Sequence, residues 1–207
     1  MSAEYDLTII GGGPVGMFAA FYAGMRNARV QLLESLPELG GQVQALYPEK
    51  IIHDVAGYPA IKGRELVAQL EKQLTQFPID IQLASPVTDV TGAMGDFTIT
   101  TASGQQSHSK AIIVATGSGA FEPRRLAVDN AAEFENKQLF YHIPSVKQFA
   151  DRTVLVAGGG DSAIDMALML EPVAKHVYNM HRRDRFRGME HNVDLLKRLP
   201  LKSRRHF

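Results

Sequence analysis

YDLTIIGGGPVG, at residues 5–16, is the stretch that decides the fold, because it combines a short apolar strand, a glycine-rich turn and the start of a helix. Each glycine of this GxGxxG pattern has its own role: Gly11 permits the tight turn, Gly13 lets a pyrophosphate approach the backbone, and Gly16 lets helix and strand pack closely. The N-terminus of the helix offers free N–H groups and partial positive charge to phosphates. The stretch therefore predicts a βαβ unit that binds a dinucleotide.

A second glycine-rich turn, GGGDSA at residues 158–163, follows the apolar strand predicted at 153–157. One such string is weak evidence, since it also occurs in unrelated α/β units. Two copies, each with its own strand and helix, predict two bound dinucleotides.

The residues that end the next strand differ between the two copies. The first strand ends on Glu34, eighteen residues after Gly16, and a carboxylate there accepts hydrogen bonds from ribose hydroxyls and repels a 2′-phosphate. The second strand runs into Arg182 and Arg183, with Arg187 close behind, and guanidinium groups bind a 2′-phosphate. Such a basic run is otherwise a solvated face or a nucleic-acid patch, but its place after the strand favours phosphate binding. We therefore expect FAD at the first turn and NADP(H), rather than NAD, at the second.

The composition excludes several classes of function. The chain has 207 residues, 45% of them hydrophobic, which is ample for buried cores. Its 22 Lys and Arg residues balance 22 Asp and Glu residues, so we expect no nucleic-acid partner and no membrane partner. No apolar run is long enough to span a bilayer and no cationic leader precedes the first strand, so a cytoplasmic location is expected.

Two residue types limit the chemistry further. Cysteine is absent, which excludes disulfides, thiolate metal ligands and thiol chemistry on this chain. The seven histidines are scattered and form no pair with metal-binding spacing, so we expect no metal site.

The order of the elements predicts an α/β fold with two Rossmann-like domains and an inserted β-meander. A loop without regular structure is expected at residues 35–63, after the first βαβ unit. Short alternating strands at 86–101, followed by the apolar strand 111–115, indicate the meander. The Gly- and Pro-containing stretch 117–125 is the expected hinge. It would divide an FAD-binding domain, residues 1–116, from an NADPH-binding domain, residues 117–207. A short helix is expected at residues 145–150, before the second glycine turn.

The two glycine turns, the sequence IIVATG at 112–117 and the run HRRDRFR at 181–187 together resemble the two-dinucleotide flavoproteins of the thioredoxin reductase superfamily. Thioredoxin reductases carry a CxxC pair shortly before the second turn, whereas YHIPSV at 141–146 has no sulfur. The segment YPEKIIHDVAGYP at 47–59 resembles the thioredoxin-reductase-like, type 2 ferredoxin–NADP reductases of bacteria.

The resemblance implies an FAD-dependent oxidoreductase that passes electrons between NADPH and a small redox protein such as ferredoxin or flavodoxin. The cofactors supply the chemistry, so no catalytic side chain is expected. A homodimer is also implied. Without a dithiol, reduced flavin cannot pass electrons to a disulfide on this chain. A reductase that serves a separate thiol protein, or that reduces oxygen directly, is a weaker alternative.

The resemblance also implies a set of cofactor contacts. Those for FAD fall on Gly11, Gly13, Pro14, Gly16, Glu34, Gly41, Gln42, Tyr47, Val87, Thr116 and Phe121. Those for NADPH fall on Gly158, Gly160, Asp161, Ser162, Arg182, Arg183 and Arg187. Tyr47 is the expected aromatic beside the flavin, although Tyr47 and Phe121 taken alone would each be ordinary packing residues.

Members of this family continue, after the NADPH domain, with a segment that returns to the FAD domain and carries a Gly-Asp pair for the FAD pyrophosphate. The sequence contains no such segment, so the resemblance implies a C-terminally incomplete chain. The alternative to an active reductase is a non-catalytic fragment that binds one nucleotide or associates through its uncovered edges.

Overall fold

The computed structural model describes residues 4–119, 125–183, 185–199 and 202–205. The chain divides into two compact units. The first unit comprises Met1–Tyr47 and Gly63–Phe134, and the second comprises Pro48–Lys62 and Glu135–Phe207. Both have α/β architecture, as predicted. The division differs from the expected boundary at residue 117, because the second unit begins after Phe134 and also contains the separate segment Pro48–Lys62.

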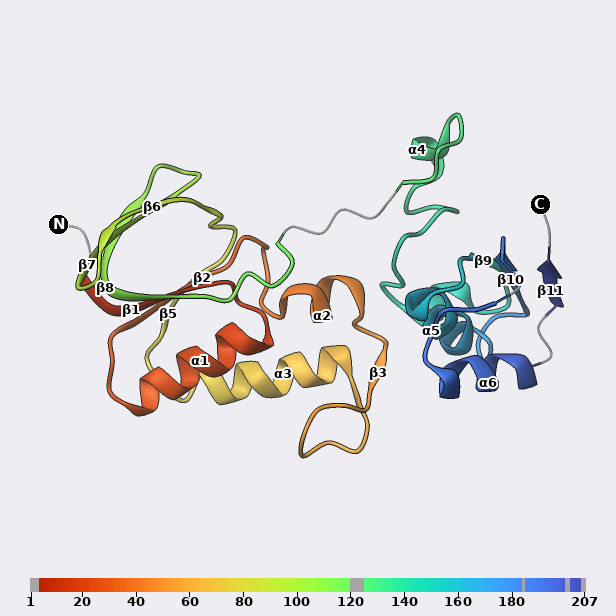
Figure 1. Ribbon diagram of the computed structural model, residues 1–207, viewed down its shortest axis with the longest axis horizontal. Coiled ribbons are helices and arrows are strands. Elements are labelled where there is room, and N and C mark those ends of the chain that lie inside the picture. The colour runs from red at the N-terminus through yellow and green to blue at the C-terminus, as the bar shows by residue number, and fades with distance from the viewer. Residues whose placement is uncertain (1–3, 120–124, 184, 200–201, 206–207) are drawn as a thin grey trace. The chain divides into compact units, whose positions relative to one another are not determined.

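The first unit is built on a six-stranded sheet with the order β5-β2-β1-β8-β7-β6 (Figure 1). Strands β5, β2, β1 and β8 are parallel to their neighbours in this part of the sheet, whereas β7 pairs antiparallel with both β8 and β6. The strands are β1 (Glu4–Ile10), β2 (Val30–Leu33), β5 (Asp80–Gln82), β6 (Val87–Ala93), β7 (Asp96–Thr101) and β8 (Gln106–Val114). The predicted meander is present, but its last strand and the apolar strand predicted at 111–115 form one continuous strand, β8. β8 pairs with β7 through residues 106–109 and with β1 through residues 108–114.

Helices α1 (Pro14–Met25) and α3 (Gly63–Leu74) lie side by side against this sheet (Figure 1). Their buried faces close a core with the parallel strands, made of Ile9, Met17, Ala20, Val30, Leu32, Leu39, Val67 and Leu74. A further helix, α2 (Gly41–Leu46), lies within the stretch that was expected to lack regular structure, so that prediction is wrong there. Val43 of α2 packs against the core, which explains why this segment is ordered as a helix. The first unit ends with the short helix α4 (Ala131–Phe134).

The second unit contains a three-stranded parallel sheet, β11-β10-β9. Its elements are β3 (Ile51–Ile52), β4 (Ile61–Lys62), the 3₁₀ helix η1 (Val146–Phe149), β9 (Thr153–Ala157), α5 (Asp161–Leu170), β10 (His176–His181), α6 (Glu190–Arg198) and β11 (Lys202–Arg205). The helix predicted at residues 145–150 is thus found as η1. Strands β3 and β4 form a small antiparallel hairpin. Lys50, just before β3, lies with its Nζ 2.7 Å from the Asp165 carboxylate on α5, which attaches this segment to the second unit.

In the part of the chain that the structure describes, no helix is both long and apolar enough to cross a membrane.

Tyr5 on β1 connects this strand to β5 in the parallel part of the first sheet. Its hydroxyl donates a hydrogen bond to Asp80 on β5, although β2 lies between their strands. Burial, together with this hydrogen bond to a carboxylate, raises the pKa of the Tyr5 phenol to about 12. The folded chain therefore favours the neutral phenol.

We expect Tyr5→Phe to lower the free energy of unfolding at neutral pH by about 1 kcal/mol, the usual net contribution of one hydrogen bond. Because the pKa of Tyr5 rises from 10.0 to about 12 on folding, its contribution is complete below pH 10 and is lost as the pH rises toward 12. Urea unfolding at neutral pH and near pH 12 measures the effect. The wild-type chain should lose more stability between these conditions than the variant, and equal losses would contradict the argument.

Candidate functional site

The first glycine turn joins the carboxyl end of β1 to α1, and two of its glycines are required by packing. Gly11 has φ +109°, and a Cβ there would lie 2.4 Å from the Ala115 carbonyl oxygen. A Cβ at Gly16 would lie 1.8 Å from the Gly11 carbonyl oxygen. Gly13 differs, because the nearest atom to its Cβ position is the Gly41 Cα at 4.0 Å. This is the open face that the second glycine needs if a pyrophosphate is to approach the backbone.

Glu34 lies directly after β2 and is buried against this turn. Its Oε2 accepts a hydrogen bond from the Gly12 N–H at 2.7 Å. Its Oε1 accepts bonds from the Leu36 N–H at 2.8 Å and the Ser35 hydroxyl at 3.0 Å. The carboxylate therefore holds the turn in place. Since a carboxylate offers about four acceptor positions, about one remains for a ribose hydroxyl.

A second pair of glycines supports the first turn from the other side. The Gly40 N–H donates to the Gly12 carbonyl at 2.9 Å, and a Cβ at Gly41 would lie 3.1 Å from the Gly13 Cα. The structure thus brings Gly41 to the turn, with Gln42 beside it on α2.

The other residues predicted for FAD are placed as follows. Pro14 is the first residue of α1, and Tyr47 caps the C-terminal end of α2. Thr116 lies at the turn, with its nitrogen 3.1 Å from the Cβ position of Gly11. Val87 begins β6, two residues after Ser85, whose N–H donates to the Glu34 carbonyl at 2.8 Å. Phe121 lies outside the described residues.

The second glycine turn joins β9 to α5 with a related geometry. Gly158 has φ +148°, which favours glycine, while a Cβ at Gly160 would meet no atom within 4 Å. Asp161 and Ser162 open α5 and are exposed, although the Asp161 Oδ1 already accepts the Met189 N–H at 2.8 Å. Gly160 therefore presents the open face of this turn.

The basic segment after β10 folds back onto the second turn. The Arg187 N–H donates to the Gly159 carbonyl at 2.8 Å. The His181 ring stacks on Phe186, with centroids 5.4 Å apart, and its Nε2–H donates to the Arg185 carbonyl at 3.2 Å. The side chains of Arg182, Arg183 and Arg187 are exposed beyond the end of β10. The structure thus brings the backbone of this segment to the turn and leaves the three guanidinium groups accessible.

Each turn makes an equivalent backbone hydrogen bond to its neighbouring strand, and this bond allows the two turns to be aligned. The Gly11 N–H donates to the Leu33 carbonyl at 2.8 Å, and the Gly158 N–H donates to the Met180 carbonyl at 2.9 Å. The next residue in each strand is therefore equivalent, which pairs Glu34 with His181.

His181 is a candidate site residue that was not predicted from the sequence. The Cβ position of Gly159 lies 2.4 Å from the His181 ring, just as that of Gly12 lies 3.1 Å from the Glu34 carboxylate. An imidazole in place of the carboxylate removes the negative charge that would repel a 2′-phosphate. Eighteen residues after the last position of each motif lie Glu34 in the first copy and His181 in the second, so Arg182 lies one residue beyond the equivalent of Glu34.

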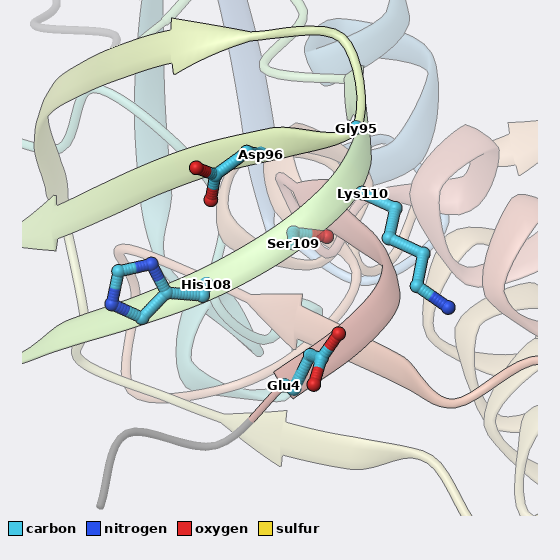
Figure 2. Close-up of a pocket in the computed structure, with 6 residues that line it drawn as sticks. All are labelled: Glu4, Gly95, Asp96, His108, Ser109 and Lys110. Atoms are coloured by element: carbon cyan, nitrogen blue, oxygen red, sulfur yellow. The ribbon is translucent and has the colours of Figure 1, made fainter.

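A cavity of about 240 Å³ lies elsewhere in the first unit, lined by Glu4, Gly95, Asp96, His108, Ser109 and Lys110 (Figure 2). It lies at the amino end of β1, about 20 Å along the strand from the glycine turn. Because open α/β sheets bind their ligands at the carboxyl ends of the strands, this cavity is separate from the candidate site. Among the described residues, no cluster of His, Asp or Glu is arranged to hold a metal ion.

The family described as pyridine nucleotide-disulphide oxidoreductase matches residues 5–199 of this chain. Ferredoxin–NADP reductase from Levilactobacillus brevis is 61% identical over 196 residues, which cover 95% of this chain and 59% of that protein. The corresponding protein from Limosilactobacillus reuteri is 57% identical over 194 residues, which cover 93% of this chain and 58% of that protein. The chain therefore spans just under three fifths of the length of these relatives.

The fold is also similar to solved thioredoxin reductases. The Lactococcus lactis enzyme gives a TM-score of 0.81 at 29% identity, covering 98% of this chain and 64% of that chain. The T. acidophilum enzyme gives 0.80 at 22% identity, covering 97% of this chain and 64% of that chain, and supports the fold alone.

We expect Gly16→Ala to destabilise the first unit by about 1–3 kcal/mol, because the new methyl group would overlap the Gly11 carbonyl and force the turn apart. Gly13→Ala is the matched control, since its methyl group meets open space and Gly13 has an ordinary φ of −71°. Thermal unfolding followed by circular dichroism compares the two. A similar loss in both variants would contradict the separate roles assigned to these glycines.

Proposed function

Since this chain belongs to the pyridine nucleotide-disulphide oxidoreductase family, we propose that it is the nucleotide-binding part of an FAD-dependent ferredoxin–NADP reductase. FAD would bind at the Gly11 turn and NADPH at the Gly158 turn. When bound, these cofactors supply the hydride and single-electron chemistry, and the protein binds and orients them.

The main support for this proposal is the difference between the residues at the carboxyl end of β2 and those at the carboxyl end of β10. A buried carboxylate, Glu34, follows the first turn, and an imidazole with exposed guanidinium groups follows the second. The first arrangement suits an adenosine ribose with free hydroxyls, and the second suits a ribose that carries a 2′-phosphate. The open backbone at Gly13 and Gly160 leaves room for a pyrophosphate at each turn.

The residues of the chain would have separate roles in binding. The N-terminal turns of α1 and α5 would donate N–H groups to the two pyrophosphates. Glu34 would accept from the FAD ribose, while Arg182, Arg183 and Arg187 would bind the NADPH 2′-phosphate. Gly41, Gln42, Tyr47, Val87, Thr116 and Phe121 would complete the FAD contacts, and Asp161 and Ser162 those of NADPH.

The electron acceptor, the assembly and the location are part of the same proposal. Ferredoxin or flavodoxin is the proposed acceptor, because the relatives from L. brevis and L. reuteri are named ferredoxin–NADP reductases. A homodimer in the cytoplasm is also proposed.

A second candidate, a non-catalytic nucleotide-binding fragment, is favoured by one observation. Val15, Phe18, Tyr22 and Met25 form an apolar stripe along α1, and each is more than half exposed. Such a stripe is typical of a surface that another polypeptide covers.

Flavin retention and reduction test the proposed function directly. We expect the purified chain, mixed with FAD and passed through gel filtration, to retain one FAD per chain, which anaerobic NADPH bleaches and oxidised ferredoxin restores. Flavin-bound protein that NADPH leaves yellow supports the non-catalytic fragment. Protein that retains no flavin and binds no NADP⁺ in calorimetry rejects both candidates.

We expect Arg182→Ala with Arg183→Ala to raise the Kd for NADP⁺ about 100-fold and to leave that for NAD⁺ nearly unchanged. Charge-assisted hydrogen bonds to phosphate contribute about 1.5–3 kcal/mol each, and only NADP⁺ has the 2′-phosphate. Calorimetry with both nucleotides measures the ratio. Lys197→Ala with Arg198→Ala, at the exposed C-terminal end of α6, is the control for the same change in net charge. An equal loss for both nucleotides would reject the 2′-phosphate assignment.

A further inference from the structure

Asn179 is a buried polar residue at a position where the first unit has leucine. It lies in β10, directly before Met180, and is 2% exposed. The backbone alignment of the two turns makes it equivalent to Leu32, which is fully buried in the core of the first unit. An aliphatic side chain therefore fits this position of the fold.

Among the described residues, the amide of Asn179 makes one hydrogen bond, which goes to the glycine turn. Its Nδ2 donates to the Gly158 carbonyl at 3.3 Å. Its Oδ1 is buried and has no hydrogen-bond donor among the residues that the structure describes. A buried acceptor without a donor costs free energy, so asparagine is a poor choice here for stability alone.

The peptide group that follows the first glycine of each turn is held by different contacts in the two units. In the first turn this group contains the Gly11 carbonyl and the Gly12 N–H, and the Glu34 carboxylate binds the N–H. In the second turn it contains the Gly158 carbonyl and the Gly159 N–H. His181 replaces the carboxylate there, and Asn179 binds the carbonyl instead.

The helix contact also changes between the two turns. The Gly11 carbonyl lies against Gly16, where a Cβ would be only 1.8 Å from its oxygen. The equivalent of Gly16 in the second turn is Ala163, whose methyl lies 2.8 Å from the Cβ position of Gly158. A methyl group is too large for the close contact that Gly16 makes with the Gly11 carbonyl, so the Gly158 carbonyl does not have that contact with its helix.

We infer that Asn179 is a positioning residue for pyrophosphate binding at the second turn. By holding the Gly158 carbonyl, its amide fixes the peptide plane that leads into Gly160, where the open backbone would let a pyrophosphate approach. The inference rests on the proposed function, since it assigns the second turn to a pyridine nucleotide. It also explains why a turn that has lost the carboxylate, and can therefore accept a 2′-phosphate, keeps a defined backbone.

The test compares Asn179→Leu, which copies Leu32, with Asn179→Ala, which removes the amide without filling its place. We expect both variants of the full chain to raise the Kd for NADP⁺ and for NAD⁺ by the same factor, about five- to tenfold, because the pyrophosphate is common to both. Asn179→Leu should do so with an unchanged or higher Tm. Asn192→Leu, which removes a side-chain hydrogen bond to Asp165 elsewhere in the second unit, is the control and should leave both Kd values unchanged.

Calorimetry and thermal unfolding on the same samples separate the outcomes. Wild-type affinity in both Asn179 variants overturns the inference and leaves the proposed function intact. Weaker binding that appears only together with a lower Tm in both variants also overturns it, since the role would then be structural. If the wild-type chain binds neither NADP⁺ nor NAD⁺, the assignment of the second turn fails and the inference fails with it.

Discussion

The contact between the Gly11 carbonyl oxygen and Gly16 is the constraint on which the first unit depends. With no side chain at Gly16, α1 can begin against the end of β1, and Met17 and Ala20 then enter the core beside Ile9. Any side chain at that position would move the helix away from the sheet. The same close approach places the first turn of α1 at the carboxyl edge of the parallel strands, where α/β proteins bind nucleotides.

The two turns reach similar backbone geometry by different chemistry. The first uses the buried carboxylate of Glu34, which accepts a hydrogen bond from the Gly12 N–H. The second has an imidazole in that place and uses an uncharged amide, Asn179, to hold the backbone. Under the proposed function, Glu34 both selects the nucleotide and holds the first turn, whereas His181 and Asn179 divide these two roles in the second unit.

Much of the fold could be predicted from sequence because its signals are local. Glycine spacing, apolar strands and the position of Glu34 identify the βαβ units and the open faces at Gly13 and Gly160. Contacts between distant segments leave no such signal. Val43 of α2 packs on the core of the first unit, and Lys50 pairs with Asp165 of the second unit, and neither contact can be inferred from local sequence. The role of His181 could have been read from spacing, whereas that of Asn179 required the hydrogen bond to Gly158.

Residues 48–62 leave the first unit after Tyr47 and return to it at Gly63, so the second unit is assembled from two separate pieces of chain. Excising residues 135–207 as an independent polypeptide would remove Lys50 and leave the mostly buried Asp165 carboxylate without its neutralising ammonium group. A single proteolytic cut near residue 134 would likewise leave the hairpin joined to the other fragment. In evolutionary terms, transferring the second unit to another protein would require two separate segments of chain, because residues 135–207 alone lack Lys50.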